Sequence, residues 1–330
     1  MKIKRIGKSN VEVTEIAFGA WAAGGWMWGG TDYKLSVRAI ESAVDSGMTT
    51  IDTAPAYGFG LSEKIVGDAI KGKRDKVQIL TKYGLRWDTD KGKFFFPSVS
   101  NEGKPVRMYK YASKTNVINE CEESLQRLGI DYIDLYQIHW SDPTTPIEET
   151  MEAVELLIQQ GKIIASGVCN YTADEMKRAD QVVSLASNQV PYSMVKRDIE
   201  NEVVPFCLKN EIGILAYSPL QRGVLTGKIT HDYQFNKGDN RQNLPYYQGD
   251  NLDTINQFLQ KIKPIADDRK MSLTQLVINW TLKQPGITCV LVGARSPEQV
   301  DENIKAAGFD LTEQEMKTIN SELDNLNLAI

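Results

Sequence analysis

Short apolar runs alternate with amphipathic segments along almost the whole chain of 330 residues. We count eight such runs, and most of them carry apolar residues at consecutive positions, which is typical of parallel strands buried on both faces. They are IAFGAW (16–21), TTIDTA (49–54), VQILTK (77–82), YIDLYQIH (132–139), IIASGVCN (163–170), VSLASNQV (183–190), GILAYS (213–218) and ITCVLVG (287–293). The segments between them repeat apolar residues at helical spacing, as in Val117, Cys121, Leu125 and Leu128. Eight strands, each followed by a helix, predict a (β/α)8 TIM barrel.

Three features add to this plain repeat. KIKRIG and VEVTEI, on either side of KSN, predict an N-terminal β-hairpin that closes the bottom of the barrel. Residues 83–112, after the third strand, and 219–251, after the seventh, are longer than ordinary barrel loops, and loops of that length are usually functional or disordered. Two extra helical patterns, near 252–270 and 272–284, precede the eighth strand.

We expect one domain over residues 1–330, because no low-complexity linker interrupts the alternation of strands and helices. An open, doubly wound sheet is the alternative fold. It is weakened because no GxGxxG motif follows the first strand.

The strand ends carry the candidate chemistry, because a (β/α)8 barrel forms its active site at the carboxyl ends of its strands. Asp52 ends the second strand with Tyr57 in the following loop, Lys82 ends the third and His139 the fourth. Neighbouring strands lie about 4.8 Å apart, so these side chains can share one pocket. A lysine ammonium lowers the pKa of a nearby tyrosine, and an aspartate beside the lysine keeps that charge in place. The group predicts that Tyr57 gives a proton to a carbonyl oxygen that His139 orients.

Each of these residues alone has a simpler interpretation. An Asp–Lys pair at a barrel mouth is more often a salt bridge than a catalytic pair, and a lone tyrosine or histidine more often serves packing. Their joint occurrence on successive strand ends favours catalysis. A glycosidase is disfavoured, because Asp52 is the one carboxylate at these strand ends and glycosidases need two.

Composition narrows the classes of partner. With 43 acidic and 38 basic residues the net charge is -5, and no basic stripe stands out, so we expect no nucleic-acid partner. No stretch approaches the roughly 18 apolar residues of a membrane span, and the N-terminus lacks the apolar segment of a signal peptide. Four scattered cysteines and two histidines do not suit a standard zinc cluster, so we expect no metal. Scattered cysteines in a long chain suit a reducing compartment better than a disulfide framework, so we expect a cytoplasmic location.

Seven motifs, in their usual order, resemble the aldo-keto reductase family, and the chain is most similar to its bacterial general-stress and inositol-cluster reductases. The motifs are IDTAPAYGFGLSE, LTKYG, DYIDLYQIHW, GKIIASGVCNY, NQVPYS, LAYSPLQRGVLTGK and GARSPEQVDEN. The resemblance spans nearly the whole chain. It implies NAD(P)H-dependent reduction of aldehydes and ketones, reversible toward alcohol oxidation, with Asp52, Tyr57, Lys82 and His139 as the catalytic tetrad.

The resemblance also implies a nicotinamide cofactor. Tyr217 is expected to stack on the nicotinamide ring, and Asn170 and Gln189 to hydrogen-bond its carboxamide. Residues 218–228 are expected along the pyrophosphate, and a helix starting at Ser296-Pro297 near the adenosine and phosphates. Arg295 is the candidate for holding a 2′-phosphate, which favours NADP(H), with NAD(H) as the alternative. All expected cofactor contacts are Gly19, Ala20, Trp21, Asp52, Cys169, Asn170, Gln189, Tyr217, Ser218, Pro219, Leu220, Gln221, Gly223, Leu225, Lys228, Arg241, Gly293, Arg295, Gln299, Glu302 and Asn303.

Aromatic residues are frequent around the expected pocket. The residues expected to bind substrate are five tryptophans and two members of the tetrad: Trp21, Trp26, Trp28, Trp87 and Trp140, with Tyr57 and His139. Aromatic rims suit flat apolar carbonyls and also the faces of sugars, so the sequence leaves the small-molecule substrate open. The segment KGKFFFPSV in the first long loop is expected to be either a lid or a contact between subunits, in a monomer or a homo-oligomer.

Two alternative functions stay open beside carbonyl reduction. The physiological direction could be the oxidation of a sugar or polyol with NAD(P)+ as acceptor. The other alternative is a regulatory protein rather than an enzyme: a module that senses NADP(H) and has only weak turnover. The intact tetrad disfavours this alternative.

Overall fold

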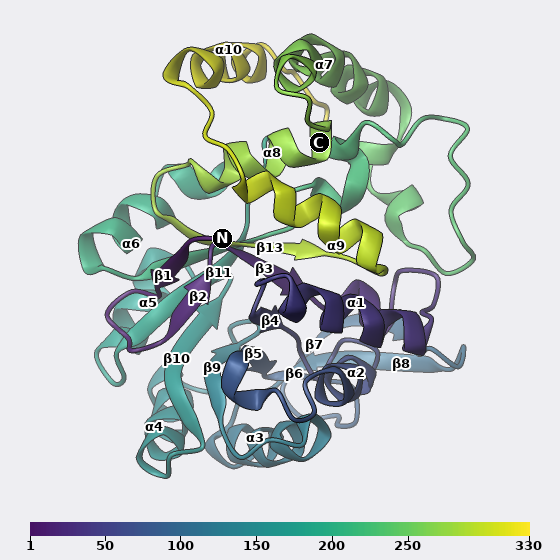
Figure 1. The fold of residues 1–330 in the computed structure, drawn as a ribbon. Helices are drawn as coiled ribbons and strands as arrows, with labels where there is room; N and C mark the ends of the chain where they lie inside the picture. The colour runs from purple at the N-terminus through teal and green to yellow at the C-terminus, as the bar shows by residue number, and fades with distance from the viewer.

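The computed structural model describes residues 1–330 and shows a closed barrel of eight parallel strands surrounded by helices (Figure 1). The strand order is β10-β11-β12-β13-β3-β4-β5-β9, and β9 pairs with β10 to close the ring. The barrel strands are β3 (Ile16–Gly19), β4 (Thr50–Asp52), β5 (Gln78–Tyr83), β9 (Ile133–Ile138), β10 (Ile163–Cys169), β11 (Leu185–Pro191), β12 (Gly213–Tyr217) and β13 (Ile287–Gly293). Each strand overlaps one of the eight apolar runs, so the predicted (β/α)8 barrel is confirmed.

Two cores, one on each face of the sheet, explain why the strands carry consecutive apolar residues. Side chains alternate between the faces of a strand. Leu80, Leu135 and Leu215 are fully buried inside the barrel. Ile51 and Ile79 belong to the much larger core between the strands and the helices. Because both faces are covered, apolar residues are favoured at consecutive strand positions.

Ten helices surround the barrel. They are α1 (Tyr33–Asp45), α2 (Leu61–Ala69), α3 (Lys114–Leu128), α4 (Ile147–Gln159), α5 (Ala173–Asp180), α6 (Val203–Asn210), α7 (Gly249–Asp268), α8 (Leu273–Leu282), α9 (Pro297–Ile304) and α10 (Glu313–Asp324). The two extra helical patterns expected before the eighth strand are α7 and α8. α7 packs against α10 at the top of Figure 1, whereas α8 is buried at every position after its first residue.

An antiparallel hairpin closes the amino end of the barrel, as expected. It pairs β1 (Ile3–Arg5) with β2 (Glu12–Thr14). Ile6, Val11 and Val13 are buried and join the apolar side chains inside the barrel. Gly213, the first residue of β12, makes room for this plug, because a Cβ there would lie 3.0 Å from Ile6.

The first long loop forms a small antiparallel sheet rather than an irregular connection. It orders β6 (Leu85–Arg86), β8 (Pro105–Lys110) and β7 (Lys93–Val99), and we call residues 85–110 the flap. The flap is tied to the loop after β3, since Trp26 Nε1 donates to Ser98 Oγ at 2.9 Å and Asn101 Nδ2 donates to the Gly24 carbonyl at 3.1 Å. These bonds hold the flap against the carboxyl end of the barrel.

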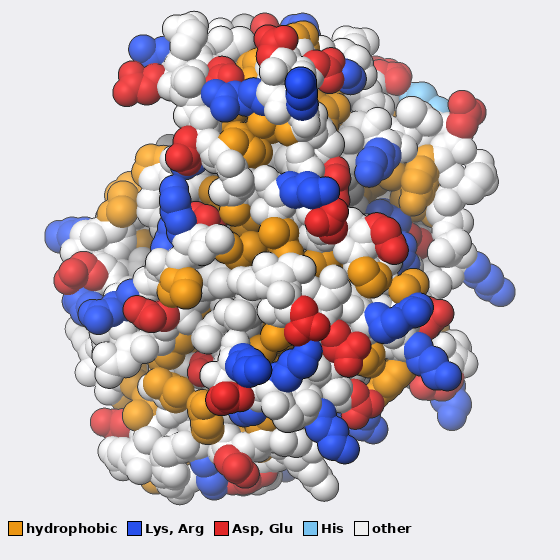
Figure 2. All heavy atoms as spheres, in the orientation of Figure 1, with side chains coloured by type: hydrophobic (Ala, Val, Ile, Leu, Met, Phe, Trp, Pro, Cys, Tyr) orange, Lys and Arg blue, Asp and Glu red, His pale blue; other side chains and the backbone are white.

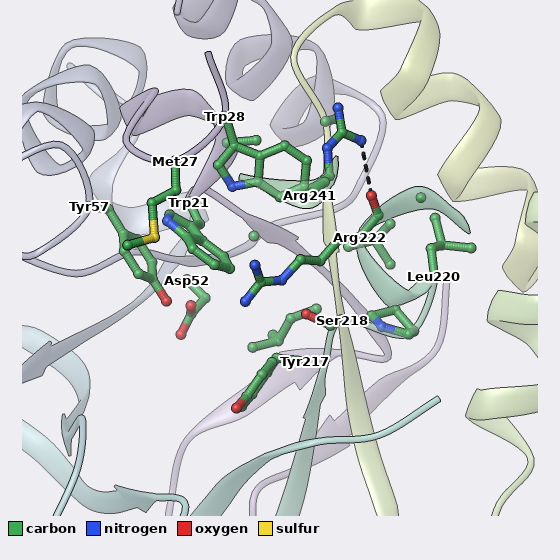
Figure 3. A pocket seen from close by; sticks show the side chains of 18 of the residues that line it. Trp21, Met27, Trp28, Asp52, Tyr57, Tyr217, Ser218, Leu220, Arg222 and Arg241 are labelled. Atoms are coloured by element: carbon green, nitrogen blue, oxygen red, sulfur yellow. Dashed lines mark hydrogen bonds between the residues drawn. The ribbon is translucent and has the colours of Figure 1, made fainter. Parts of the chain in front are cut away.

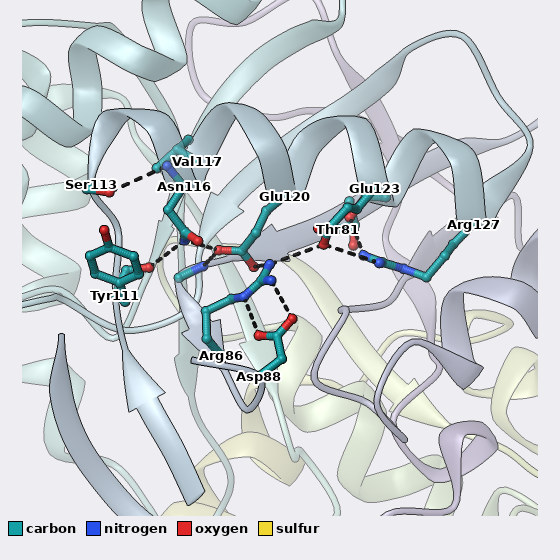
Figure 4. Close-up of polar contacts among 12 residues, drawn as sticks. Thr81, Arg86, Asp88, Tyr111, Ser113, Asn116, Val117, Glu120, Glu123 and Arg127 are labelled. Carbon is teal, nitrogen blue, oxygen red and sulfur yellow. Dashed lines mark hydrogen bonds and ion pairs between the residues drawn. The ribbon is translucent and has the colours of Figure 1, made fainter. Parts of the chain in front are cut away.

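A buried polar network anchors the base of the flap to α3 (Figure 4). Glu120 of α3 is fully buried and accepts hydrogen bonds from the Gly84 backbone N–H at 2.9 Å and from Asn116 Nδ2 at 2.6 Å. Arg86 lies with its Nη1 3.6 Å from the Glu120 carboxylate, and its guanidinium forms two hydrogen bonds to Asp88, at 2.8 and 2.6 Å. Burial raises the pKa of Glu120 to about 7, although Arg86 and the two hydrogen bonds oppose that rise.

Charges of both signs are interspersed over the face that carries α1, α9 and α10 (Figure 2). None of the helices combines the length and the apolar composition that crossing a bilayer requires.

Candidate active site

The carboxyl ends of the barrel strands open into a cavity of about 480 Å³ (Figure 3). Gly19, Asp52, Gln189, Tyr217 and Gly293 reach it from β3, β4, β11, β12 and β13. The loops after β3 and β12 and the flap supply most of the remaining walls. The cavity therefore lies where a (β/α)8 barrel places its active site.

The four predicted catalytic residues meet at one end of this cavity. Lys82 Nζ donates to Asp52 Oδ1 at 2.6 Å and to the Thr53 carbonyl at 2.9 Å, with both members of the ion pair buried. The same Nζ lies 4.8 Å from the centroid of the Tyr57 ring. The rings of Tyr57 and His139 meet edge to face, with centroids 5.6 Å apart. Tyr57, His139 and Asp52 line the cavity, whereas the Lys82 ammonium is buried beside them and does not line it.

Burial and the Lys82 charge act on the pKa of Tyr57 in opposite directions. Burial raises the pKa of Tyr57 to about 12, and the Lys82 ammonium offsets only part of that rise. Lys82 thus lowers the pKa of Tyr57, as expected, but burial outweighs this effect, and the net pKa lies above the ordinary value of a tyrosine. Burial opposes the charge on Lys82, but Asp52 raises the pKa of that ammonium above its ordinary value. Tyr57 keeps its proton through the neutral range, which a proton donor requires.

His139 is neutral at physiological pH. Burial lowers the pKa of His139 well below its ordinary value, and the nearby Lys82 charge lowers it further. A neutral imidazole has one N–H donor and one acceptor nitrogen, so His139 can donate a hydrogen bond to a carbonyl oxygen.

Two glutamines hold Asp52 from the side opposite Lys82. Gln189 Nε2 donates to Asp52 Oδ2 at 2.8 Å, and Gln137 Nε2 lies 3.4 Å from the same oxygen. Gln189 is one of the two residues expected to bind the nicotinamide carboxamide, and its Oε1 is left to accept such a bond. Sequence reasoning missed Gln137, whose one signal is that it is a polar residue inside the fourth run, YIDLYQIH, as Asp134 also is.

The other carboxamide candidate, Asn170, lies beside the tetrad. Its Nδ2 donates to the His139 carbonyl at 3.1 Å, and its Oδ1 accepts from the Tyr217 hydroxyl at 3.0 Å. Asn170 has a φ of 59°, which turns the chain sharply at the end of β10. Its neighbour Cys169 is buried, and burial raises the pKa of this thiol, so the sulfur is neutral.

Most of the expected cofactor contacts line the cavity. These are Gly19, Trp21, Asp52, Cys169, Asn170, Gln189, Tyr217, Ser218, Pro219, Leu220, Gly223, Lys228, Arg241, Gly293, Arg295, Gln299, Glu302 and Asn303.

Three expected cofactor contacts, Ala20, Gln221 and Leu225, do not line the cavity. Ala20 and Leu225 are fully buried in the core, and Gln221 instead accepts a hydrogen bond from Ser193 Oγ at 3.2 Å. At Gln221 the chain makes a tight turn, with positive φ at Gln221, Arg222 and Gly223. The turn directs the Arg222 side chain into the cavity. Arg222 is missing from the predicted cofactor contacts, although it stands next to a glycine in the segment expected along the pyrophosphate.

Helix α9 and the second long loop form the far end of the cavity. α9 begins at Pro297 with Ser296 as its N-cap, as expected. Arg295, just before it, donates from Nη1 to the Trp28 carbonyl at 3.4 Å. The loop after β12 crosses to the loop after β3, because the Asn240 N–H donates to the Met27 carbonyl at 3.2 Å. Arg241, expected in this loop, is fixed by a paired contact with Asp239.

All but one of the aromatic residues expected to bind substrate line the cavity. Trp21, Trp26, Trp28 and Trp140 line the cavity together with Tyr57 and His139. Trp87 does not: it packs edge to face on Phe59 outside the cavity, with ring centroids 5.4 Å apart.

The flap supplies aromatic residues that the substrate prediction missed. Phe95 and Phe96 of β7 line the cavity, and Phe95 packs on Trp140 with ring centroids 5.2 Å apart. The signal for them is the FFF run, which sequence reasoning left as either a lid or a subunit contact.

The Aldo/keto reductase family model matches residues 15–324. The chain belongs to this family. It is 40% identical to the aldo-keto reductase YhdN from Bacillus subtilis over 98% of this chain and 94% of that protein. It is 37% identical to the NADH-specific methylglyoxal reductase from Escherichia coli over 95% of each chain.

Two solved structures of aldo-keto reductase type are also similar to this chain. The glycerol dehydrogenase AKR11B4 from Gluconobacter oxydans has a TM-score of 0.88 at 37% identity, covering 98% of this chain and 95% of that one. The holo form of an aldo-keto reductase from Bacillus halodurans has a TM-score of 0.77 at 28% identity, covering 98% and 96%.

Membership in the aldo/keto reductase family makes the protein an oxidoreductase that uses a nicotinamide cofactor, and this part of the prediction is confirmed. The preference for NADP(H) stays a prediction, since one aldo-keto reductase similar to this chain is NADH-specific.

Proposed function

We propose that this protein reduces a small aldehyde or ketone to the alcohol, with Tyr57 as the proton donor. The observation that supports this most is the meeting of Tyr57, Lys82, Asp52 and His139 at the end of one cavity. The nicotinamide cofactor, when bound, supplies the hydride to the carbonyl carbon. The protein residues supply the proton and the binding geometry.

Each member of the tetrad has a distinct role. Tyr57 holds its proton until negative charge develops on the substrate oxygen, because its pKa is raised to about 12. The neutral imidazole of His139 donates a hydrogen bond to that oxygen and sets its angle. The buried Lys82 ammonium stabilises the phenolate that remains after proton transfer, and Asp52 keeps the ammonium charged and in place.

We infer that the cofactor lies along the cavity from Tyr217 to the start of α9. At the tetrad end, Gln189 Oε1 and Asn170 Oδ1 are acceptors for the carboxamide of the nicotinamide, beside the Tyr217 ring. The cavity walls also contain two buried donors without a protein partner, the indole nitrogens of Trp21 and Trp28. Such donors fit a ligand rich in acceptor oxygens, as a dinucleotide is.

NADP(H) is the cofactor we propose, with NAD(H) as the alternative. Arg295 lines the cavity beside the first turn of α9, and its guanidinium donates only to a backbone carbonyl. A guanidinium without a carboxylate partner, next to free helical N–H groups, suits a 2′-phosphate.

The substrate wall favours a carbonyl compound with an apolar face. Trp26, Trp140, Phe95 and Phe96 form most of that wall. The opposite direction, oxidation of a polyol with NAD(P)+, is the second candidate, and the similarity to a glycerol dehydrogenase at a TM-score of 0.88 favours it.

We also propose a cytoplasmic enzyme that acts on small molecules. All four cysteines are buried free thiols, which suits a reducing compartment.

The test is turnover by the purified protein with NADPH and with NADH. The substrates are an activated aromatic aldehyde and methylglyoxal, and glycerol with each oxidised cofactor tests the reverse direction. We expect reduction by the wild type, and a loss of about 10²- to 10⁴-fold in Tyr57→Phe because only the proton donor is removed. Cofactor affinity, measured by tryptophan quenching, should be nearly unchanged in that variant.

Undiminished turnover in Tyr57→Phe would contradict the proposed role. Tight cofactor binding with no turnover on any carbonyl or alcohol would favour the sensing alternative instead.

A further inference from the structure

The flap is a basic element in an acidic protein. Residues 85–110 contain six basic and three acidic side chains, a net charge of +3, whereas the chain as a whole carries -5. One of the basic residues, Arg86, is paired with Asp88. Because the flap lies over the carboxyl end of the barrel, its remaining positive charges are close to the entrance of the cavity. Positive charge at the entrance of a cavity attracts anionic ligands.

The pairing of the flap strands places Lys110 on the side of the flap that faces the cavity. Side chains at directly paired positions lie on the same face of an antiparallel sheet. Lys110, the last residue of β8, is paired with Leu85 of β6, which lines the cavity, and with Lys93 of β7. Two residues earlier in β8, Met108 is fully buried and pairs with Phe96, another residue that lines the cavity.

The Lys110 ammonium lies against the aromatic substrate wall. Its Nζ is 4.3 Å from the centroid of the Phe95 ring and 5.0 Å from that of the Trp140 ring. Both rings line the cavity, and Lys110 and the two rings are all partly exposed. The positive charge therefore lies at the rim of the substrate end. Trp140 directly follows His139, the residue proposed to orient the carbonyl oxygen.

No carboxylate forms a salt bridge with Lys110. Burial lowers the pKa of its ammonium, and the more distant carboxylates of Glu175 and Asp142 oppose that effect. Both carboxylates are engaged elsewhere, since Glu175 belongs to the capping box of α5 and Asp142 accepts from the Ala112 N–H at 2.9 Å. Lys93, at the paired position, adds a second positive charge, and like charges directly opposite each other destabilise a sheet. An anion bound at the two ammonium groups would relieve this repulsion.

Lys110 is separate from the basic residues of the proposed cofactor site. Arg222, Lys228 and Arg241 line the cavity from the loop after β12, and Arg295 does so from the segment before α9. Lys110 comes from the flap and contacts the rings of the substrate wall. An anion bound at Lys110 therefore belongs to the substrate and not to the cofactor.

We propose that Lys110, supported by Lys93, binds an anionic group at the far end of the carbonyl substrate. The inference rests on the proposed function, because it takes the ligand at the tetrad to be an aldehyde or ketone. The substrate then has three parts. Its carbonyl group lies at Tyr57 and His139, an apolar segment lies against the aromatic wall, and a carboxylate or phosphate lies at the rim.

The test compares two pairs of aldehydes that differ mainly in charge. They are 4-carboxybenzaldehyde with its methyl ester, and glyceraldehyde 3-phosphate with glyceraldehyde. The readout for each pair is the ratio of kcat/KM for the anionic member to kcat/KM for the neutral member. We expect the wild type to prefer the anionic member of at least one pair, and the pair with the larger ratio identifies the anionic group.

Removing the Lys110 charge should lower this ratio. We expect Lys110→Met to reduce it about 3- to 10-fold, the effect of one partly exposed ion pair, and mainly through KM because the anion is remote from the reacting carbon. Lys110→Arg keeps the charge and should retain most of the ratio. Lys93→Met should lower the ratio in the same direction by a smaller factor.

Arg107→Met is the matched control. Arg107 lies in the same strand and also contacts an aromatic ring, 4.7 Å from the centroid of Phe94, but the alternation of side chains places it on the opposite face from Met108. Its removal changes the net charge of the flap as much as Lys110→Met does, and it should leave the ratio at the wild-type value.

Three results would overturn the proposal. The first is a wild type that does not prefer the anionic member of either pair, and the second is an Arg107→Met variant that lowers the ratio as much as Lys110→Met. The third is a loss in Lys110→Met that is equal for both members of each pair, as expected if Lys110 only supports the aromatic wall. The proposed function fails separately, if the wild type reduces none of the four aldehydes with NADPH or NADH.

Discussion

Tyr57, Lys82 and His139 show how burial and charge oppose each other at single residues. Burial raises the pKa of Tyr57 and lowers that of His139, so both are neutral at physiological pH. At Lys82 the result is the reverse: burial opposes the charge, but the carboxylate of Asp52, 2.6 Å away, together with the other neighbouring groups raises the pKa of the ammonium and keeps it charged. One fixed positive charge therefore lies beneath two neutral groups that can donate hydrogen bonds to a substrate oxygen.

Removing the Lys82 charge should shift the pH dependence of alcohol oxidation. In that direction Tyr57 must be deprotonated to accept a proton, so the rate rises with pH as the phenolate forms. Lys82 lowers the pKa of Tyr57 from the value that burial alone would impose. Lys82→Met should therefore move the rising limb to higher pH. At a fixed pH below the limb, the rate should fall about tenfold for every pH unit by which the limb moves.

The measurement is kcat/KM for alcohol oxidation between pH 7 and 11. Lys64→Met, at an exposed position of α2, is the control and should leave the profile unchanged. A limb that stays at the same pH in Lys82→Met would show that the ammonium does not tune the tyrosine.

Sequence reasoning predicts the tetrad and misses Arg222 for a physical reason. Asp52, Lys82 and His139 stand at the ends of apolar runs, and strand ends can be located from such runs alone. The direction of the Arg222 side chain instead depends on positive φ values at three consecutive residues, 221–223. Only one of these residues is a glycine, so the sequence does not indicate such a turn. Trp87 fails in the opposite way, because the flap sheet turns it toward Phe59 and away from the cavity.

At the scale of elements, the flap is the part of the fold that local pattern does not predict. Barrel strands and helices bury apolar faces, and their periodicity is visible in the sequence. β7 instead has a mixture of exposed and partly buried residues, because the flap covers the cavity rather than a core of its own. It is held by specific contacts such as Trp26 to Ser98 and by the network around Glu120.

The buried Glu120 carboxyl should make stability depend on pH. Its pKa is raised to about 7 in the folded protein, above the value of about 4.3 for an exposed glutamate. Between these values the folded state binds more protons than the unfolded state, so the free energy of unfolding falls as pH rises. Glu120→Gln should remove this contribution, about one to three kcal/mol between pH 5 and 8.

The measurement is urea unfolding at pH 5, 6, 7 and 8. Glu123→Gln is the matched control, because Glu123 also pairs with Arg86, at 3.2 Å, but its side chain is 43% exposed. Its slope with pH should match that of the wild type. Parallel slopes in Glu120→Gln and wild type would mean that the buried carboxyl does not titrate in this range.

For the whole molecule, the inner core connects the two ends of the barrel. Ile6 and Val13 enter from the hairpin at the amino end, Leu80 and Leu215 fill the middle, and Tyr217 packs against the same cluster at the active-site end. The residues that close the bottom and the residue proposed to stack on the nicotinamide thus belong to one packed column. We therefore propose that residues 1–330 fold as one cooperative domain.

Ile6→Ala tests that proposal at the end of the molecule farthest from the active site. Ile6 is fully buried, and truncating such a side chain costs about 2 to 5 kcal/mol because a cavity remains. Five of the six tryptophans lie at the carboxyl end of the barrel or in its flap, so tryptophan fluorescence reports the opposite end from the substitution. In a single cooperative unit, fluorescence and far-UV circular dichroism must shift together to lower denaturant. Ile3→Ala, in the same hairpin but with Ile3 64% exposed, should shift neither. Suppose instead that Ile6→Ala lost its circular dichroism in two steps while its fluorescence transition stayed at the denaturant concentration of the wild type. The hairpin and the active-site end would then be separate units.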